Sequence, residues 1–123
     1  MTFCIPVEAA ILINRSLPAT THAVTNLGQL ESALARPMHT FGGQLLYPTL
    51  IERATALLHG VATAHAFFDG NKRTAWLSTA TYLEREGSPL QSIPALEVAD
   101  FVVDVVVGNI DQASAALWLL DHT

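Results

Sequence analysis

The stretch from Pro48 to Pro89 constrains the fold most strongly, because its apolar residues repeat at helical spacing on both sides of one short break. Pro48 is expected to open the first helix, whose apolar face is formed by Leu50, Ala54, Leu57, Leu58 and Val61. Gly60 falls inside this helix and costs roughly 1 kcal/mol relative to alanine unless close packing requires it. Phe-Asp-Gly at 68–70 interrupts the pattern, and a second helix is predicted over 71–86. Two long helices joined by a tight turn therefore form the centre of the predicted fold.

Two more helices are predicted before this pair. The first covers residues 6–16, because its leading proline suits the first turn of a helix. Residues 18–25 are polar and are predicted to form a loop. Asn26 then has the place of an N-cap, with Gln29 three residues later as in a capping box, and Pro37 ends that helix.

The segment 95–107 is ambiguous, because its β-branched residues taken alone would suggest a strand. Its acidic residues Glu97, Asp100 and Asp104 fall at spacings of three and four. A helix gathers these positions onto one stripe, whereas a strand would put Glu97 on the opposite face from the other two. We therefore predict a mostly buried helix with one solvated acidic edge.

The remaining segments complete an all-helical pattern. Residues 38–47 contain a Gly-Gly pair and are predicted to form a loop or a short extended flap. Asn109 and Gln112 repeat the spacing of a cap and predict a last helix that runs through Leu120. The expected fold class is all-α, a compact bundle of about six helices in a single domain over residues 1–123.

Composition excludes several classes of protein. The chain has 123 residues, of which 50% are hydrophobic and only 14% are charged, the opposite of a disordered chain. The net charge of -5 argues against direct binding to nucleic acid, which normally requires a basic surface. Cys4 is the only cysteine, so a reducing compartment fits, and no apolar run is long enough to suggest a membrane span. We expect a cytoplasmic protein.

Two adjacent cations mark the start of the helix predicted over 71–86. Lys72 is the only lysine of the chain, and Arg73 follows it directly. A helix N-terminus favours anions, so these cations are a poor choice for stability alone. Exposed N–H groups of the first turn, the preceding Gly70 and two cations together are typical of a phosphate site.

Residues just before the cations supply groups for a reaction at a phosphate. His65 exchanges a proton near neutral pH and is a candidate general base. Asp69 is a hard oxygen ligand of the kind that Mg²⁺ prefers when it also binds substrate phosphates. Asn71 offers an amide either to a phosphate or to the loop itself. The set predicts phosphoryl or nucleotidyl transfer, with Mg²⁺ at Asp69.

The segment HAFFDGNKR, residues 65–73, resembles the signature of the Fic/Doc superfamily. Lys72 stands where most Fic proteins have a glycine, and this variant looks like the Doc (death-on-curing) branch. Upstream, LESALARP at 30–37, Phe-Gly-Gly at 41–43 and Tyr-Pro at 47–48 are also similar to Doc-like chains. The resemblance implies the helical Fic/Doc fold over nearly the whole chain.

The resemblance also implies an activity. Fic proteins commonly transfer AMP from ATP to a protein hydroxyl, whereas Doc-type proteins bind ATP in reverse and transfer the γ-phosphate. The target class of Doc-type proteins is a threonine of elongation factor Tu, whose modification stops protein synthesis. A toxin that is a protein kinase is therefore expected, with AMP transfer as the alternative.

Site roles carry over from the family by position. His65 would be the general base that deprotonates the acceptor hydroxyl, and Asp69 would hold Mg²⁺. The turn at Gly70, with Asn71, Lys72 and Arg73, would hold the nucleotide phosphates. A buried aromatic, the third residue of the motif, would fix the loop against the core.

Departures from the family pattern refine these expectations. Trp76 occupies a position where many Fic proteins have an arginine that contacts phosphates, which disfavours AMP transfer. The inhibitory [S/T]xxxE[G/N] motif is missing. The only Glu-Gly or Glu-Asn pair is at 86–87, and the residue four positions before its glutamate is Tyr82, not Ser or Thr. A cognate antitoxin that folds on the toxin surface is therefore expected as a partner, with residues 27–36 and 38–47 as borders of its groove.

Some interpretations remain open from sequence alone. The chain could be a catalytically silent module that only binds an antitoxin. Arg36 could reach the nucleotide or close the C-terminus of its helix, and the second role is favoured. His59 is expected to be structural, and the other histidines form no cluster with the spacing of zinc ligands.

Overall fold

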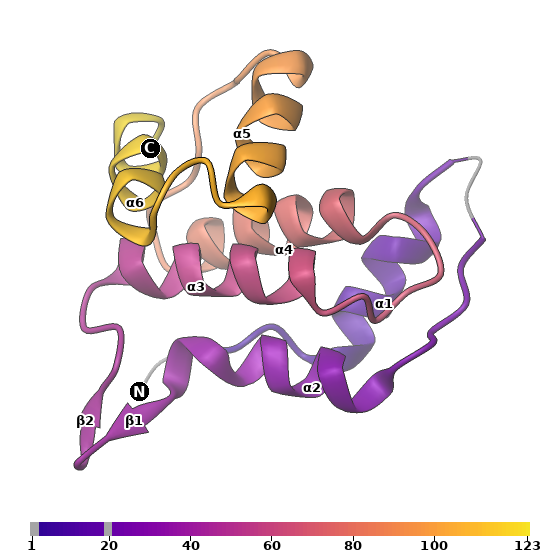
Figure 1. Ribbon diagram of the computed structural model, residues 1–123, viewed down its shortest axis with the longest axis horizontal. Helices are drawn as coiled ribbons and strands as arrows, with labels where there is room; N and C mark the ends of the chain where they lie inside the picture. Colours follow the sequence, from indigo (N-terminus) through magenta and orange to yellow (C-terminus); the bar gives the residue numbers. More distant parts are fainter. Residues whose placement is uncertain (1–2, 19–20) are drawn as a thin grey trace.

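The computed structural model describes residues 3–18 and 21–123, and these form six α-helices, one 3₁₀ helix and a two-stranded hairpin (Figure 1). The elements are α1 (Val7–Ser16), α2 (Leu27–Ala35), η1 (Arg36–Met38), β1 (Thr40–Phe41), β2 (Gln44–Leu45), α3 (Leu50–Thr63), α4 (Asn71–Arg85), α5 (Ala95–Val107) and α6 (Gln112–Asp121). The predicted all-α fold class is confirmed. No helix of the described ranges is both long and apolar enough to cross a membrane.

Helices α3 and α4 form the centre of the bundle. They lie side by side, with α1 and α2 on one side and α5 and α6 on the other (Figure 1). The predicted apolar face of α3 is buried, and Ala54, Leu57, Leu58 and Val61 are all 0% exposed. Helix α4 contributes Ala75, Tyr82 and Leu83 to the same core. The helical periodicity around the 68–70 break therefore identified the core pair correctly.

Side-chain caps begin three of the helices. The Asn26 side chain accepts from the Gln29 N–H at 3.1 Å, as predicted. Thr49 caps α3, so α3 begins two residues after Pro48. The predicted cap of the last helix is wrong, because Asp111 and not Asn109 accepts the capping hydrogen bond. The Asn109 side chain donates to Asp104 instead, at the turn that follows α5.

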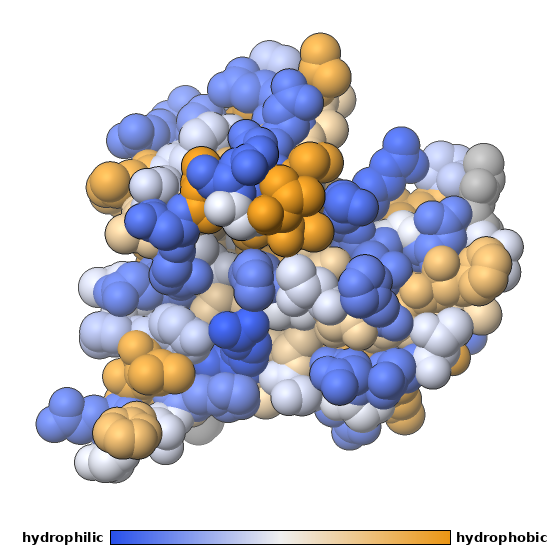
Figure 2. All heavy atoms as spheres, viewed as in Figure 1, coloured by the Kyte–Doolittle hydropathy of each residue, from blue (hydrophilic) through white to orange (hydrophobic). Residues whose placement is uncertain are grey.

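Helix α5 is helical as predicted, but it is not mostly buried. Only Phe101, Val102 and Val105 are buried, and Figure 2 shows apolar residues at the surface over this helix. Leu96 is 74% exposed and Val107 is 61% exposed. The reason is that the contacts of α5 with α3, α4 and α6 bury only the face that carries these three residues.

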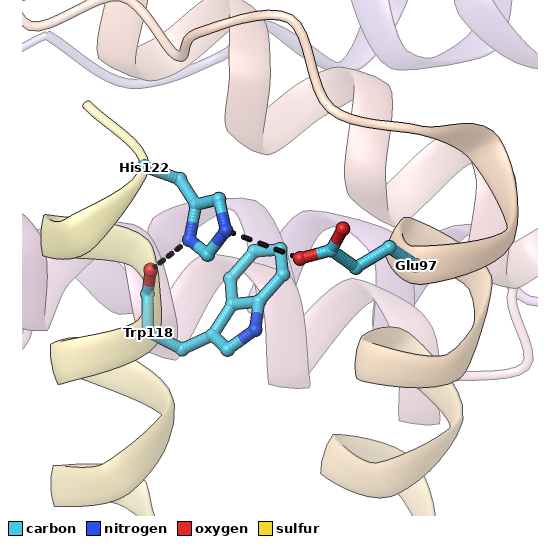
Figure 3. A network of polar contacts seen from close by, with 3 residues as sticks. All are labelled: Glu97, Trp118 and His122. Carbon is cyan, nitrogen blue, oxygen red and sulfur yellow. Dashed lines mark hydrogen bonds and ion pairs between the residues drawn. The ribbon is translucent and has the colours of Figure 1, made fainter.

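An aromatic cluster joins α4, α5 and α6. The ring of Phe101 stacks on Trp118 at 3.8 Å, and Trp76 packs edge-on against both. The His122 ring stacks on the other side of Trp118 and forms a 3.4 Å ion pair with Glu97 (Figure 3). Part of the predicted acidic edge of α5 is therefore bonded to α6, and Trp76 packs against the core as expected.

The segment 38–47 forms a hairpin, in agreement with the predicted flap. Thr40 pairs with Leu45 and Phe41 with Gln44. The two glycines between the strands have φ of 60° and 80°, the left-handed conformation that a tight two-residue turn requires. Phe41 is 83% exposed, so the hairpin projects an aromatic ring into solvent.

Gly60 is required by close packing. A Cβ at this position would lie 2.9 Å from the Arg36 Cδ and 3.5 Å from the Ala33 Cβ. The Arg36 side chain is held by hydrogen bonds to His59 and Tyr47, so it cannot simply move away.

We predict that Gly60→Val lowers the free energy of unfolding by about 1–3 kcal/mol, because the new side chain overpacks the contact between α3 and η1. Urea denaturation followed by circular dichroism measures the change. Gly28→Ala is the control, since a Cβ there meets only Asn26 Oδ1 at an ordinary 3.8 Å. Equal stability of Gly60→Val and wild type would contradict the packing role.

Candidate active site

All six site residues predicted from the sequence line one cavity of about 410 Å³ at the turn between α3 and α4. They are His65, Asp69, Gly70, Asn71, Lys72 and Arg73. Leu17 at the end of α1 and Val106 of α5 complete its wall with other apolar residues. In Figure 1 this turn lies at the end of the central helix pair, next to α1.

His65 has an unusual backbone conformation. It is the only non-glycine residue of the described ranges with a positive φ, 50°, and its side chain is exposed. Such residues store strain and persist only where the surroundings hold them. Here the Thr25 hydroxyl donates to the His65 carbonyl at 3.2 Å.

The segment before α2 is hydrogen-bonded to the loop that carries His65. The Thr25 and Asn26 N–H groups both donate to the Ala66 carbonyl, at 2.7 and 3.1 Å, and the Phe68 N–H donates to the Ala23 carbonyl. The sequence identified residues 18–25 only as a loop. Their pairing with the site is a long-range contact that no local pattern indicates.

Asn71 closes the turn with its side chain. Its Oδ1 accepts from the Phe67 N–H at 3.1 Å, and its Nδ2 donates to the Phe67 carbonyl at 2.9 Å. The Phe67 ring is only 3% exposed, as expected for the buried aromatic of the motif. Of the two partners considered for the Asn71 amide, phosphate or loop, the structure shows the loop.

The N-terminus of α4 is open toward the cavity. The N-cap of α4 is Gly70, which has φ 78° and provides no side-chain cap. The side chains of Asn26, Thr49 and Asp111, in contrast, cap α2, α3 and α6. Asp69 Oδ1 accepts from the Gly70 N–H at 2.8 Å, which fixes the carboxylate beside the turn. The first-turn N–H groups of α4 favour an anion in the cavity.

Lys72 and Arg73 add positive charge to this helix end. Both side chains are exposed and line the cavity. Within residues 3–18 and 21–123, neither forms an ion pair with a carboxylate. Their charges therefore remain available to a bound anion.

Asn14 of α1 supports the site and was missed by the sequence analysis. It is 1% exposed, and its Nδ2 donates to the Asp69 carbonyl at 2.9 Å and to the Thr74 Oγ1 at 3.1 Å. It thereby ties the Asp69 turn to the first turns of α4. The only sequence signal was a polar residue on the inner face of an amphipathic helix.

Arg36 does not line the cavity around His65. It lies at the C-cap of α2, where its guanidinium is 3.3 Å from His59 Nδ1 and donates to the Tyr47 hydroxyl at 3.1 Å. Burial, and then the charge of Arg36, lower the pKa of His59. This arrangement agrees with the helix-end position favoured from the sequence.

Comparison with known families agrees with the geometry of this turn. The model of the Fic/DOC family matches residues 6–83, which is more than half of the chain. The chain belongs to the Fic/DOC family. The matched region contains α1 to α3, all of α4 except its last two residues, and the whole cavity lining except Val106 of α5.

One curated relative is the protein named Toxin Doc of Mycolicibacterium smegmatis (strain ATCC 700084 / mc(2)155). The two sequences are 44% identical over 81 residues. The alignment covers 66% of this chain and 57% of the relative, so the chain spans little more than half of that Fic/DOC relative.

We predict that Asn14→Leu, which keeps the number of side-chain heavy atoms and removes the amide, destabilises the protein by about 1–3 kcal/mol, because it leaves the Thr74 hydroxyl and the Asp69 carbonyl unpaired. Hydrogen exchange should also accelerate in the amides of residues 69–74. Ser16→Ala on the same helix is the control, since its hydroxyl bonds only to the exposed end of α1. Unchanged exchange in this turn would refute the supporting role of Asn14.

Proposed function

We propose that this chain is the toxin of a toxin–antitoxin pair. It would act in the cytoplasm as a protein kinase that transfers the γ-phosphate of ATP to a Ser/Thr hydroxyl of a translation factor of the elongation factor Tu class, and so inhibit protein synthesis. The observation that carries the proposal is the cavity that brings an exposed imidazole beside an open helix N-terminus and two cations, neither of which pairs with a carboxylate of the described residues. The Fic/DOC family and the name of the relative, Toxin Doc, support it.

His65 has the position of a general base. Its exposed ring can meet a hydroxyl on a large protein substrate at the mouth of the cavity. In the proposed step the hydroxyl oxygen attacks the γ-phosphorus and its proton passes to His65. The bond from the γ-phosphorus to the bridging oxygen breaks, and ADP leaves with that electron pair.

Lys72, Arg73 and the first-turn N–H groups of α4 would hold the phosphates, since they present positive charge to one cavity. Asp69 fits a magnesium ion, because it is an exposed carboxylate in the cavity lining next to these phosphate donors. Mg²⁺ would neutralise charge on the phosphate oxygens. Gly70 lets the backbone turn so that the carboxylate and the helix end face the same space.

Trp76 favours phosphoryl transfer over AMP transfer, the alternative activity. Its ring packs edge-on against Phe101 and Trp118, so this position supplies no charge to phosphates. Lys72 in turn fills space that a glycine would leave for phosphates near the backbone, which supports a different pose of the nucleotide.

The place of Glu86 supports regulation by a separate antitoxin. This glutamate lies at the C-cap of α4, a full helix length from the cavity at the N-terminus, and it accepts from the Phe3 N–H. It cannot act as an inhibitory group at the phosphate site. A cognate antitoxin, bound along α2 and the 38–47 hairpin, would supply the missing control.

The kinase proposal is tested with radiolabelled ATP, Mg²⁺ and purified elongation factor Tu. Label is expected from γ-labelled ATP, and His65→Ala should reduce it at least about 100-fold, because general-base catalysis contributes on that order. His122→Gln, at the far C-terminus, is the control histidine and should retain the activity. Transfer of the α label alone would refute the kinase and establish AMP transfer.

Growth measurements separate a toxin enzyme from a catalytically silent module. We expect that expression without an antitoxin arrests growth and that His65→Ala or Lys72→Ala restores it, because each removes a reacting or phosphate-binding group. Immunoblots confirm equal expression of the variants. Arrest that persists in both variants would show that binding alone is responsible.

A further inference from the structure

A second cavity, of about 470 Å³ and with a mostly apolar wall, lies against α3 and the turn from α5 to α6. Its lining includes Arg36, Tyr47, His59 and Asp111, and none of its lining residues belongs to the His65 cavity. We propose that this cavity binds a phosphate-class oxyanion through Arg36, Tyr47 and His59. The site is independent of the proposed phosphoryl transfer.

Arg36 carries a charge without a counterion. The residue is partly buried, and its side chain crosses α3 at Gly60, where a Cβ would lie 2.9 Å from Arg36 Cδ. No carboxylate of the described ranges is within ion-pair distance of the guanidinium. A partly desolvated cation whose charge no counterion balances is unfavourable, especially in a chain of net charge -5, and an external anion would compensate it.

The two partners of Arg36 are left with protons to donate. A guanidinium has only donors, so the His59 Nδ1 at 3.3 Å must accept, and the neutral ring then carries its proton on Nε2. The Tyr47 hydroxyl likewise accepts from Arg36 at 3.1 Å and keeps its own O–H proton. The lowered pKa of His59 keeps this ring neutral. Three side chains thus offer donors to one cavity, and a tetrahedral oxyanion has acceptors for all three.

Asp111 is the group in this cavity that opposes an anion. Its Oδ1 accepts from the Ser114 N–H at 2.8 Å, and this hydrogen bond lowers the pKa of the carboxyl. An oxyanion is therefore expected on the Arg36 side of the cavity. Asp111→Asn keeps a capping oxygen and removes the charge, so it should strengthen anion binding.

The test is a titration with inorganic phosphate, with chloride at equal ionic strength as the reference, followed by NMR. The chemical shift of the Arg36 Nε–H reports binding in this cavity. The chemical shifts of the Lys72 and Arg73 amides report binding in the His65 cavity. We expect Tyr47→Phe to weaken binding at Arg36 about fivefold, the equivalent of one hydrogen bond, and to leave the Lys72 titration unchanged. Asp111→Asn should tighten binding at Arg36 several-fold.

Two results would overturn the proposal. The first is an Arg36 resonance that does not move while the Lys72 amide saturates. The second is an Asp111→Asn variant that loses stability and gains no affinity for phosphate, which would make Asp111 the counterion of Arg36 in solution. A parallel titration with acetate decides the chemical class, because binding as tight as that of phosphate would exclude a phosphate-class site.

Discussion

The pair of hydrogen bonds between the Asn71 side chain and the Phe67 backbone is the interaction on which the site depends. Phe67 is anchored in the core and Asn71 is the first residue of α4, so the pair connects the end of the loop to the start of the helix. The pair thereby fixes the open N-terminus of α4 relative to the loop that carries His65. Catalysis by positioning and charge requires such a preorganised arrangement.

Two N-terminal segments hold the same turn from outside. Asn14 reaches it from α1, and the backbone of residues 23–26 pairs with the loop that carries His65. The strained φ of His65 is maintained by these contacts. The candidate site therefore rests on three separate parts of the chain, although its polar groups come from one short segment.

The C-terminal helices lie outside the family match, and their packing on α3 and an aromatic cluster with α4 attach them to the family region. Trp76, at a position where family resemblance suggested an arginine, is the α4 member of this cluster. Where the arginine of other Fic proteins would contact phosphates, Trp76 packs against Phe101 and Trp118. The same helices also form one wall of the Arg36 cavity, so this attachment creates a second cavity.

The sequence predicts the helices, the turn and the segment 65–73 from local patterns, because helical periodicity, proline, glycine and caps act over a few residues. It failed where the deciding contact is distant. The Asn14 bonds span 55 and 60 residues, and the Thr25 bond spans 40. Only the tertiary structure decided these contacts, the exposure of α5 and the grouping of Arg36 with His59, since each depends on how helices pack and no local pattern specifies that packing.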